Sequence, residues 1–219
     1  MDPSLITIVD FGAGNLFSLE HAFRHLGYDV EVTAEPLRVL AAERIVLPGV
    51  GAFGDGMAGL AARALIQPLQ RKAGQGTPFL GICLGFQLFA TKGEEFGEHE
   101  GLGIIPGRVK RLPDGDGGDC AVRIPNIGWR ALELHREDCF SKEFGKSPMA
   151  YFVHSYSFCV DQWDCVTASI PVNGHNIVAA VQKDRVFGFQ FHPEKSGDFG
   201  LDLLKRFART NSEHRTELS

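Results

Sequence analysis

One short stretch, residues 78–89, limits what this chain can fold into more than any other part of the sequence. Its apolar run Phe79–Ile82 predicts a buried strand, and the apolar residues after it recur at helical spacing. Between strand and helix lies the pattern Gly81-x-Cys83-x-Gly85. This is the cysteine counterpart of the Gly-x-Ser-x-Gly elbow, in which a strand turns sharply into a helix and exposes a nucleophile.

The pattern has a steric and an electrostatic meaning. Side chains at the two glycine positions would clash at so sharp a turn. The thiol of Cys83 would stand at a helix N-terminus, where the helix dipole and the free amides favour a thiolate. The same amides can bind a developing oxyanion. A buried structural cysteine between packing glycines is the plain alternative, but the order of strand, glycines and helix favours the nucleophile.

The overall composition narrows the class of protein. The 219 residues suffice for one α/β domain with a full core, and the lack of an internal repeat or long linker predicts a single domain over residues 1–219. The net charge of −5 and the lack of a basic run interleaved with aromatics argue against a nucleic acid as partner. No apolar stretch is as long as a membrane span, and the N-terminus lacks the features of a signal peptide. We therefore expect a cytoplasmic protein with no membrane partner.

The cysteines and histidines do not suggest a metal site. The five cysteines are odd in number and include no Cys-x-x-Cys pair, which is typical of reduced thiols rather than of a disulfide frame or a zinc site. His21 and His25 have the spacing of two metal ligands on one helix face, but no third ligand accompanies them. A solvated helix face explains these histidines better, and we expect no metal and no other cofactor.

The first half of the chain predicts an α/β fold with a mostly parallel, doubly wound central sheet and flanking helices, because expected strands alternate with helical patterns. The expected strands are 5–9, 29–33, 44–47 and 79–82, and the expected helices are 16–26, 36–42 and 57–69, the last bent or broken near Pro68. Sites in such sheets lie at the carboxyl ends of the strands. The turn Asp10–Asn15, the loop Pro48–Gly51 and Cys83 each follow an expected strand.

The second half predicts mostly strands, which adds an antiparallel strand region to the parallel sheet. The expected strands are 104–112, 121–124, 150–160, 165–170, 177–182 and 186–191. Lys183-Asp184 fits a tight hairpin turn, and the Gly- and Asp-rich residues 113–119 predict a surface loop. A last helix is expected over residues 199–209.

A cysteine nucleophile needs a base, and the base needs a group that orients it. Among the eight histidines, His192 stands out because it ends an expected strand and is followed by Pro193-Glu194. In an extended stretch, residues i and i+2 point to the same side, which would set Glu194 beside His192 with the rigid Pro193 between them. A carboxylate beside an imidazole fixes its tautomer and raises its basicity. A strand end with a surface ion pair is the alternative, and the need of Cys83 for a base counts against it.

His154 is the competing base. Its neighbours alternate as strand residues do. We expect it to be a hydrogen-bonded wall residue or a substrate contact rather than the base.

Together these motifs resemble those of the class I, or triad, glutamine amidotransferases. The elbow Gly-Ile-Cys-Leu-Gly-Phe-Gln, residues 81–87, and the downstream His192-Pro193-Glu194 carry the resemblance. Four further stretches narrow it to the glutaminase subunits of imidazole glycerol phosphate synthase, and the likeness spans roughly residues 6–209. These stretches are Asp10–Asn15, Leu47–Phe53, Phe152–Tyr156 and Phe191–Ser196.

The resemblance implies a thioester mechanism on glutamine. Cys83 attacks the side-chain amide, His192 takes the thiol proton and later protonates the departing ammonia, and Glu194 orients His192. Water then hydrolyses the glutamyl thioester to glutamate. Contacts with the substrate glutamine are expected from the following residues: Gln87, His154, Ser155 and Tyr156.

The resemblance also implies an oxyanion hole next to the nucleophile. Its donors would be the backbone amide of Leu84 and one amide of the loop Pro48-Gly49-Val50-Gly51. Gly49 and Gly51 leave this loop free to flip a peptide, which suggests the hypothesis that a partner controls activity through it.

The implied partner is a cyclase subunit with a (β/α)8 barrel, which forms a heterodimer with the glutaminase and receives its ammonia. There the ammonia reacts with a phosphorylated ribonucleotide, giving imidazole glycerol phosphate for histidine synthesis and an aminoimidazole carboxamide ribotide. Asn15, Trp129 and Lys195 are candidates for the interface on this analogy. Trp129 fits a core aromatic equally well, because aromatics are common in both settings.

Three alternatives stay open on the sequence alone. The chain could be the glutaminase of another synthase, serving pyridoxal phosphate, guanylate or anthranilate formation, although the turn Asp10–Asn15 and the loop Pro48–Phe53 argue against it. It could be a non-catalytic module on the same fold, against which the intact Cys83, His192 and Glu194 speak. It could also be an unrelated cysteine hydrolase on an α/β sheet, which the His-Pro-Glu placement disfavours.

Overall fold

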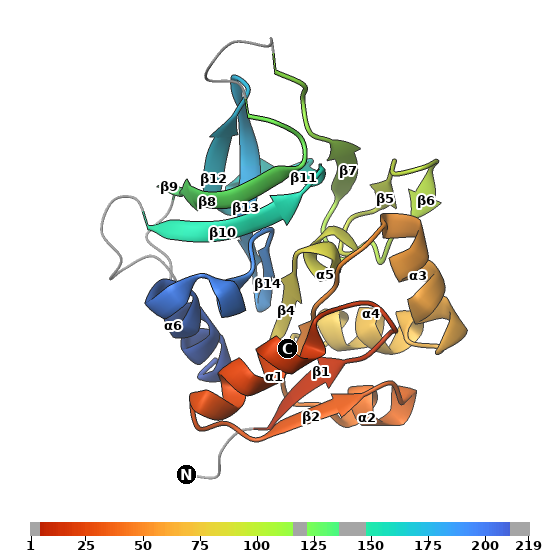
Figure 1. Cartoon of the computed structure of the whole chain (residues 1–219). Helices are drawn as coiled ribbons and strands as arrows, with labels where there is room; N and C mark the ends of the chain where they lie inside the picture. Colours follow the sequence, from red (N-terminus) through yellow and green to blue (C-terminus); the bar gives the residue numbers. More distant parts are fainter. Residues whose placement is uncertain (1–4, 116–121, 136–147, 211–219) are drawn as a thin grey trace, which may run out of the picture.

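The computed structural model describes residues 5–115, 122–135 and 148–210, and an eight-stranded sheet forms its centre (Figure 1). The strand order is β2-β1-β3-β4-β14-β13-β12-β9. The five strands of its parallel part are β2 (Val30–Thr33), β1 (Ile6–Val9), β3 (Ile45–Leu47), β4 (Phe79–Ile82) and β14 (Val186–Phe189), each parallel to its neighbour. The predicted parallel α/β sheet is confirmed.

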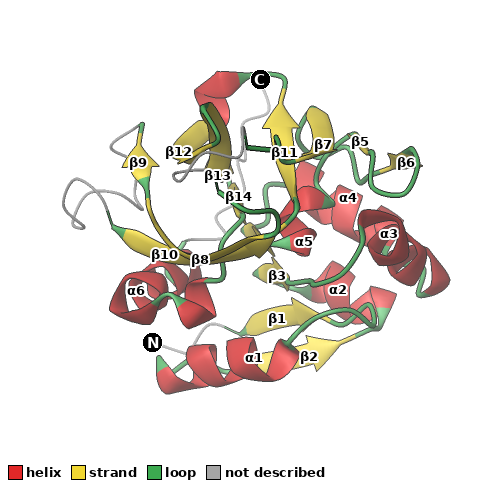
Figure 2. Ribbon diagram, turned by 45° about the horizontal axis from the view of Figure 1, so that its top comes forward, coloured by secondary structure: helices red, strands yellow, loops and turns green. Residues whose placement is uncertain are grey.

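Helices cover both faces of the parallel strands (Figure 2). α1 (Leu16–His25) and α6 (Gly197–Ala208) share one apolar cluster with Ile6 and Ile8 of β1. Buried residues of α2 (Pro36–Ala41), α3 (Phe53–Ala62) and α4 (Ile66–Gly74) belong to the cluster that contains Val9 on the other side of β1. The alternation of side chains along a strand therefore divides the core into two layers.

The helix expected over residues 57–69 is two helices, and the break lies before Pro68 rather than at it. The chain leaves α3 after Ala62, and Ala64 has a positive φ of 55°. Pro68 is the third residue of α4, in the first turn, where its missing N–H has no helical acceptor to lose. The proline is compatible with the start of a new helix and does not kink an existing one.

The antiparallel part of the large sheet comes from the second half of the chain. β13 (His175–Lys183) pairs antiparallel with β14 and with β12 (Val166–Val172), and β12 pairs with β9 (Glu133–Leu134). The hairpin between β13 and β14 turns at Asp184-Arg185, one residue later than expected, and Asp184 has a φ of 52°.

Two smaller sheets flank the large one. One has the order β11-β7-β5-β6 and contains β11 (Tyr156–Val160), β7 (Gly107–Arg111), β5 (Lys92–Gly93) and β6 (His99–Glu100). The other pairs β10 (Met149–His154) with β8 (Asn126–Ala131). In Figure 1, β8 and β10 lie above the ends of β4 and β14.

Several strand expectations in this half need correction. The single strand expected over residues 150–160 is two strands, interrupted at Ser155, because β10 pairs with β8 whereas β11 pairs with β7 in another sheet. Residues 122–124 of the strand expected at 121–124 form no strand, and pairing begins after Pro125, which has no N–H to donate. The last helix begins two residues earlier than expected. The loop expected at 113–119 lies partly, and residue 121 wholly, outside the described residues.

Candidate active site

Cys83 lies at the turn between β4 and the short helix α5 (Leu84–Gln87), as the elbow pattern predicts. Its backbone is strained, with φ of 52° and ψ of −110°. A Cβ on Gly81 would lie 2.7 Å from Cα of Phe86, and a Cβ on Gly85 would overlap the carbonyl oxygen of Leu47. Both flanking positions therefore need glycine, because backbone atoms occupy the space of a side chain.

The parallel pairing of β4 with β14 brings the segment that carries His192 next to Cys83. Ile82 is paired with Phe189, and the backbone N–H of Cys83 donates to the carbonyl oxygen of Phe189 over 2.7 Å. Cys83 follows the end of β4 at the level where the chain leaves β14 on its way to His192. Strand register thus joins two residues that are far apart in the sequence.

His192 and Glu194 lie side by side, although not for the reason expected. Nδ1–H of His192 donates to Oε1 of Glu194 over 2.8 Å, and both side chains are 4% exposed. Glu194 belongs to the one-turn 3-10 helix η2 (Pro193–Lys195), so the expectation of an extended stretch is wrong. Pro193 occupies the first helical position, which its fixed φ suits.

The surroundings of His192 favour the imidazolium. Burial alone would lower the pKa of His192, but hydrogen bonding and charge from Cys83 and Glu194 outweigh it and raise the pKa above its usual value. Nε2 of His192 is buried, and among the described residues no atom meets hydrogen-bond geometry with it. The thiol of Cys83 nevertheless interacts with this ring and helps to raise its pKa. Nε2 is therefore the nitrogen that can take up the thiol proton.

Ser196, to which sequence reasoning gave no role, braces the base. Its hydroxyl donates to the carbonyl oxygen of His192 over 2.7 Å and accepts from the backbone N–H of Tyr151 over 3.0 Å. The N–H of His192 in turn donates to the carbonyl oxygen of Tyr151. These hydrogen bonds attach the turn that contains His192 to β10. In the sequence, the serine directly after His-Pro-Glu-Lys was the only signal of this role, and in the structure it is buried.

His154 has no nitrogen left for the task of a base. Nδ2 of Asn126 donates to its Nε2, and its Nδ1–H donates to the carbonyl oxygen of Tyr156, both over 2.9 Å. Burial lowers the pKa of His154 to about 4, against a weaker opposing effect of the Tyr156 carbonyl. The ring is neutral and saturated with hydrogen bonds, which agrees with a wall residue. A contact with substrate would have to use its carbon atoms.

Gln87 and Gln190 form a buried pair beside the nucleophile. Nε2 of Gln87 donates to Oε1 of Gln190 over 3.0 Å and to the carbonyl oxygen of Tyr156 over 2.9 Å. Nε2 of Gln190 lies 3.8 Å from Sγ of Cys83, and the carbonyl oxygen of Val153 lies 4.0 Å from the same sulfur. Sequence reasoning named Gln87 but missed Gln190. A single glutamine within the apolar run 186–191 was the signal.

The expected oxyanion hole is occupied by the protein itself. The backbone N–H of Leu84 donates to the carbonyl oxygen of Gly49 over 3.2 Å. A Cβ on Gly49 would lie 3.0 Å from Cβ of Leu84 and from Phe11, and Gly51 has a φ of 109°. Val50 between them is exposed. The loop thus closes over α5, and the Leu84 amide is free for an oxyanion only after the Gly49 carbonyl turns away.

The surface around this site is apolar. Ile127, Trp129, Met149 and Val153 are exposed residues of the β8–β10 pair, and Trp129 packs edge to face against Tyr151. We call these five residues the apolar strip. Because alternate residues of a strand share a face, the strip lies on one side of the sheet, and it reaches the site where the Val153 carbonyl approaches Cys83.

The three residues expected at an interface are all exposed at this edge. Trp129 is 49% exposed, so the interpretation as a core aromatic is wrong. Asn15 caps the start of α1, with its Oδ1 accepting from the N–H of Ser18, in the turn that approaches Gly49. Lys195 is exposed on η2, next to the triad carboxylate.

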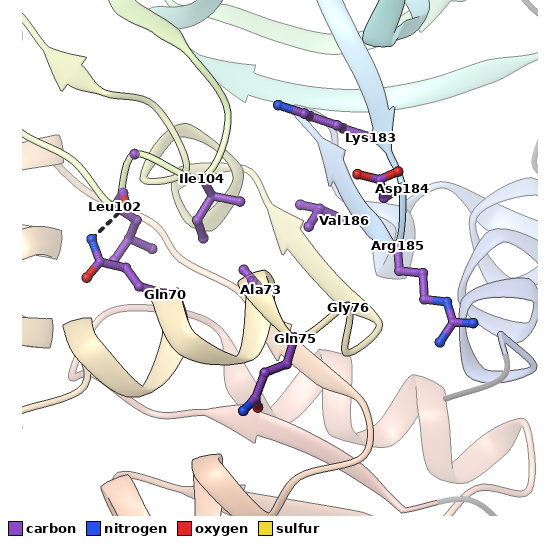
Figure 3. A pocket seen from close by; sticks show the side chains of 12 residues that line it. Gln70, Ala73, Gln75, Gly76, Leu102, Ile104, Lys183, Asp184, Arg185 and Val186 are labelled. Atoms are coloured by element: carbon purple, nitrogen blue, oxygen red, sulfur yellow. Dashed lines mark hydrogen bonds between the residues drawn. The ribbon is translucent and has the colours of Figure 1, made fainter. Parts of the chain in front are cut away.

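One cavity lies at the other end of the sheet (Figure 3). It measures about 750 Å³ and is bordered by α4, Gly76 ahead of β4, and the β13–β14 turn. In Figure 3 the side chains of Lys183 and Arg185 extend away from one another on either side of Asp184. Cys83 follows the carboxyl end of β4, so this cavity at the amino ends does not serve the nucleophile.

His21 and His25 lie exposed on α1 and border a cavity of about 400 Å³ that Glu194 also lines. Within ranges 5–115, 122–135 and 148–210, no group of three His, Cys, Asp or Glu is arranged to hold a metal ion. In the same ranges, no helix is both long enough and apolar enough to span a membrane.

Known proteins match nearly the whole chain. The family described as glutamine amidotransferase class-I matches residues 7–210. "Imidazole glycerol phosphate synthase subunit HisH" of Salinibacter ruber is 44% identical over 205 residues, covering 93% of this chain and 94% of that protein. The protein of the same name from Syntrophotalea carbinolica is 44% identical over 208 residues, covering 93% and 98%.

Solved structures share the fold at lower identity. The structure of PurLQS from Thermotoga maritima superposes with a TM-score of 0.70 at 21% identity, covering 94% of this chain and 98% of that one. The structure of a putative GMP synthase component from Thermoplasma acidophilum gives a TM-score of 0.69 at 16% identity, covering 95% and 94%.

Proposed function

The chain belongs to the class-I glutamine amidotransferase family, and we propose that it is the glutaminase subunit of an imidazole glycerol phosphate synthase. It hydrolyses glutamine to glutamate and ammonia for histidine biosynthesis. The observation that carries the proposal is the meeting of Cys83, His192 and Glu194 at the carboxyl ends of β4 and β14. The free thiols of Cys83 and Cys159 suit a cytoplasmic location.

The reaction begins with proton transfer from the thiol of Cys83 to Nε2 of His192. The thiolate attacks the side-chain carbonyl carbon of glutamine, and the carbonyl oxygen takes up the negative charge. The imidazolium then protonates the leaving nitrogen, which departs as ammonia and leaves a glutamyl thioester. A water molecule that gives a proton to His192 attacks the thioester, and the thiol is restored with the release of glutamate. Glu194 holds Nδ1–H throughout, which keeps Nε2 directed at the sulfur.

The loop Pro48–Gly51 supports a gated oxyanion hole. Rotation of the Gly49–Val50 peptide would withdraw the carbonyl oxygen of Gly49 from the N–H of Leu84 and present the N–H of Val50 in its place. Two amides would then face the developing oxyanion. Removing one donor from such an oxyanion hole typically lowers kcat by about 10²- to 10³-fold. The exposed position of Val50 lets a bound partner act on this peptide.

Changing the backbone preference of the loop tests this gate. Gly51 adopts a φ of 109°, which an alanine side chain disfavours, so Gly51→Ala should destabilise the closed conformation of the loop without filling any occupied space. We expect the glutaminase rate of the variant to lose its response to the partner and its ligand. A variant that still responds in full would remove the gate from the mechanism.

The partner that we propose is a cyclase subunit with a (β/α)8 barrel, which receives the ammonia in a heterodimer. It would combine the ammonia with a phosphorylated ribonucleotide, giving imidazole glycerol phosphate and an aminoimidazole carboxamide ribotide. The apolar strip supports a docking surface here, because monomeric proteins rarely expose such a patch beside a reactive centre. Asn15 and Lys195 would add polar contacts at its rim.

A coupled assay tests the function as a whole. Glutamate release is measured with and without the cyclase and its nucleotide ligand, for the wild type, for Cys83→Ala, and for Cys159→Ala as an exposed thiol away from the triad. We expect low activity alone, strong stimulation with both additions, no activity in Cys83→Ala and normal activity in Cys159→Ala. Stimulation by the synthases of pyridoxal phosphate, guanylate or anthranilate formation, and not by the cyclase, would contradict the proposal.

A further inference from the structure

We propose that Gln190 donates a hydrogen bond from Nε2 to the thiolate of Cys83 and that Gln87 orients Gln190 for this task. The inference rests on the proposed role of Cys83 as nucleophile. It adds a fourth group to the chemistry at the sulfur, beside the base, the carboxylate and the oxyanion amides.

A backbone hydrogen bond to β13 fixes the position of Gln190. Gln190 follows β14 directly, and its N–H donates to the carbonyl oxygen of Ala179 on β13 over 2.9 Å. Its side chain is fully buried, and Nε2 lies 3.8 Å from Sγ of Cys83. Sulfur is a large acceptor, so a donor at this distance is in contact with it. The hydrogen bond becomes shorter and stronger when the sulfur becomes an anion.

Gln87 decides which end of the Gln190 amide faces the sulfur. The carboxamide oxygen of Gln190 accepts from Nε2 of Gln87, whose own orientation is set by the carbonyl oxygen of Tyr156. Turning the Gln190 amide over would oppose two NH₂ groups and would aim an oxygen lone pair at the thiolate. The chain from Tyr156 through Gln87 to Gln190 therefore directs a donor at Cys83.

A buried polar side chain is stable only where it is hydrogen-bonded, and the sulfur of Cys83 is one of the partners of Gln190. This hydrogen bond also has a use in the reaction. When the thiol proton passes to Nε2 of His192, the N–H of Gln190 stabilises the sulfur anion that remains. When the sulfur attacks the amide carbon, the charge moves to the carbonyl oxygen and this hydrogen bond weakens. When the thioester is hydrolysed and the thiolate leaves, the bond forms again.

The charged and titratable groups around the sulfur are few. His192 is the proton acceptor, and Glu194 lies behind it. His154 lies on β10, where burial keeps it neutral, and Arg130 on β8 lies beyond it. Gln190 thus supplies a donor that carries no charge and has no titrating group of its own.

Alkylation kinetics of the full chain test this inference without substrate. The rate at which iodoacetamide modifies Cys83 is followed by mass spectrometry of its peptide as a function of pH. Gln190→Met keeps the length of the side chain and removes the donor. We expect the acidic midpoint of the profile to rise by about one pH unit, which means up to about tenfold slower alkylation on the acidic limb. The plateau at high pH should stay within about threefold of the wild type, because the nucleophilicity of a thiolate depends only weakly on the pKa of its thiol.

Three further variants sharpen the test. Gln190→Glu preserves size but puts a carboxylate near the sulfur, and the midpoint should rise further than in Gln190→Met. Gln87→Met removes only the orienting group and should give a smaller rise. Gln70→Met is the matched control, since Gln70 also donates to a backbone carbonyl, that of Leu102, but lies at the opposite end of the sheet. It should leave the profile unchanged.

An unchanged midpoint in both Gln190 variants, with the plateau intact, would overturn the inference. If a variant loses the plateau through misfolding, the side-chain amide resonance of Gln190 in ¹⁵N-labelled wild type decides instead. It should titrate with the sulfur and cease to do so in Cys83→Ala, and a resonance indifferent to pH would overturn the inference. Glutaminase activity that survives in Cys83→Ala would defeat the proposed function itself, which is a separate outcome.

Discussion

The two ring nitrogens of His192 have different surroundings. Its Nδ1–H donates to Glu194, whereas its Nε2 is buried and has no hydrogen-bond partner among the described residues. The second carboxylate oxygen of Glu194 is also buried, and among the described residues it has no hydrogen-bond partner. The chemistry of this site therefore depends on which ring nitrogen of His192 is hydrogen-bonded and which is left for a proton.

Glu194→Gln should reduce kcat by about 10²- to 10⁴-fold, because the amide cannot hold His192 in the tautomer that presents Nε2 as acceptor. The variant also loses the charge that raises the pKa of His192, while the opposing effect of burial remains. The alkaline limit of the kcat/KM profile should therefore move to lower pH. Steady-state assays across pH check both effects, with the exposed Glu133→Gln on β9 as control. A profile identical to the wild type would contradict the assigned role.

His154 should make the protein sensitive to acid. Burial lowers the pKa of His154 from 6.5 to about 4, so between these values the unfolded chain binds a proton that the folded chain does not. The free energy of unfolding therefore falls as the pH drops from about 7 to 4, by about 3 kcal/mol from this residue.

Urea unfolding at several pH values measures the effect of His154. In His154→Gln the loss of stability between pH 7 and pH 4 should be clearly smaller than in the wild type, even though the variant is less stable at pH 7. The exposed His175→Gln should behave as the wild type. An unchanged pH dependence in His154→Gln would show that another group causes the acid sensitivity.

At the scale of elements, the site depends on how tightly α5 is set between strands. Phe86 of α5 packs on Gly188 of β14, where a Cβ would overlap the ring, and Gly85 rests against the carbonyl oxygen of Leu47 at the end of β3. Close contacts with glycine on both sides place the helix that carries the Leu84 amide. The elbow is therefore a property of three elements, although its sequence pattern is local.

Gly85→Ala tests this packing. The added methyl group would overlap backbone that cannot rotate away, so we expect a loss of about 3 kcal/mol or more in stability together with glutaminase activity. Gly74→Ala is the matched control, because Gly74 is also helical and a Cβ there meets no atom within 4 Å. That variant should be as stable as the wild type or up to about 1 kcal/mol more stable. Thermal unfolding of both compares them, and equal stability would contradict the packing argument.

At the scale of the whole molecule, the proposed active site and the exposed apolar strip lie next to one another. The carboxyl ends of β1, β3, β4 and β14 carry the turn at Asn15, the oxyanion loop, Cys83 and His192, and the apolar strip borders them. A partner seated there would cover the site where ammonia is released. In the complex that we propose, one interface would both regulate the hydrolysis and receive its product.

Two tryptophans allow a paired test of this surface. Trp129 on the strip is 49% exposed, and Trp163 in η1 (Trp163–Cys165) is 47% exposed, next to residues that border a cavity at the β13–β14 turn. Trp129→Ala should weaken cyclase binding at least about tenfold and reduce stimulation, because buried aromatics dominate interfaces. Trp163→Ala should do neither. Titration calorimetry and the coupled assay measure both, and equal binding by the two variants would place the partner elsewhere.

Local patterns in the sequence were enough to predict most of the elements and to propose Cys83, His192 and Glu194 as a triad. The alternation of strands and helices, the elbow with its two glycines, and His-Pro-Glu after a strand each depend on sterics and periodicity within about ten residues, so they can be read along the chain. The same locality explains the errors. Pro68 lies in the first turn of α4 and breaks no helix, and the strand expected at 150–160 divides because its two halves pair in two different sheets.

Contacts between distant segments were decided only by the tertiary structure. Gln190 contacts Cys83, which lies 107 positions earlier in the sequence, and the N–H of Leu84 donates to the carbonyl oxygen of Gly49. No sequence motif predicts either contact. Trp129 fitted a core and a surface equally well until its strand was paired. The physical reason is that a side chain's partners are set by which strands become neighbours and in which register, and this depends on burying the core of the whole chain.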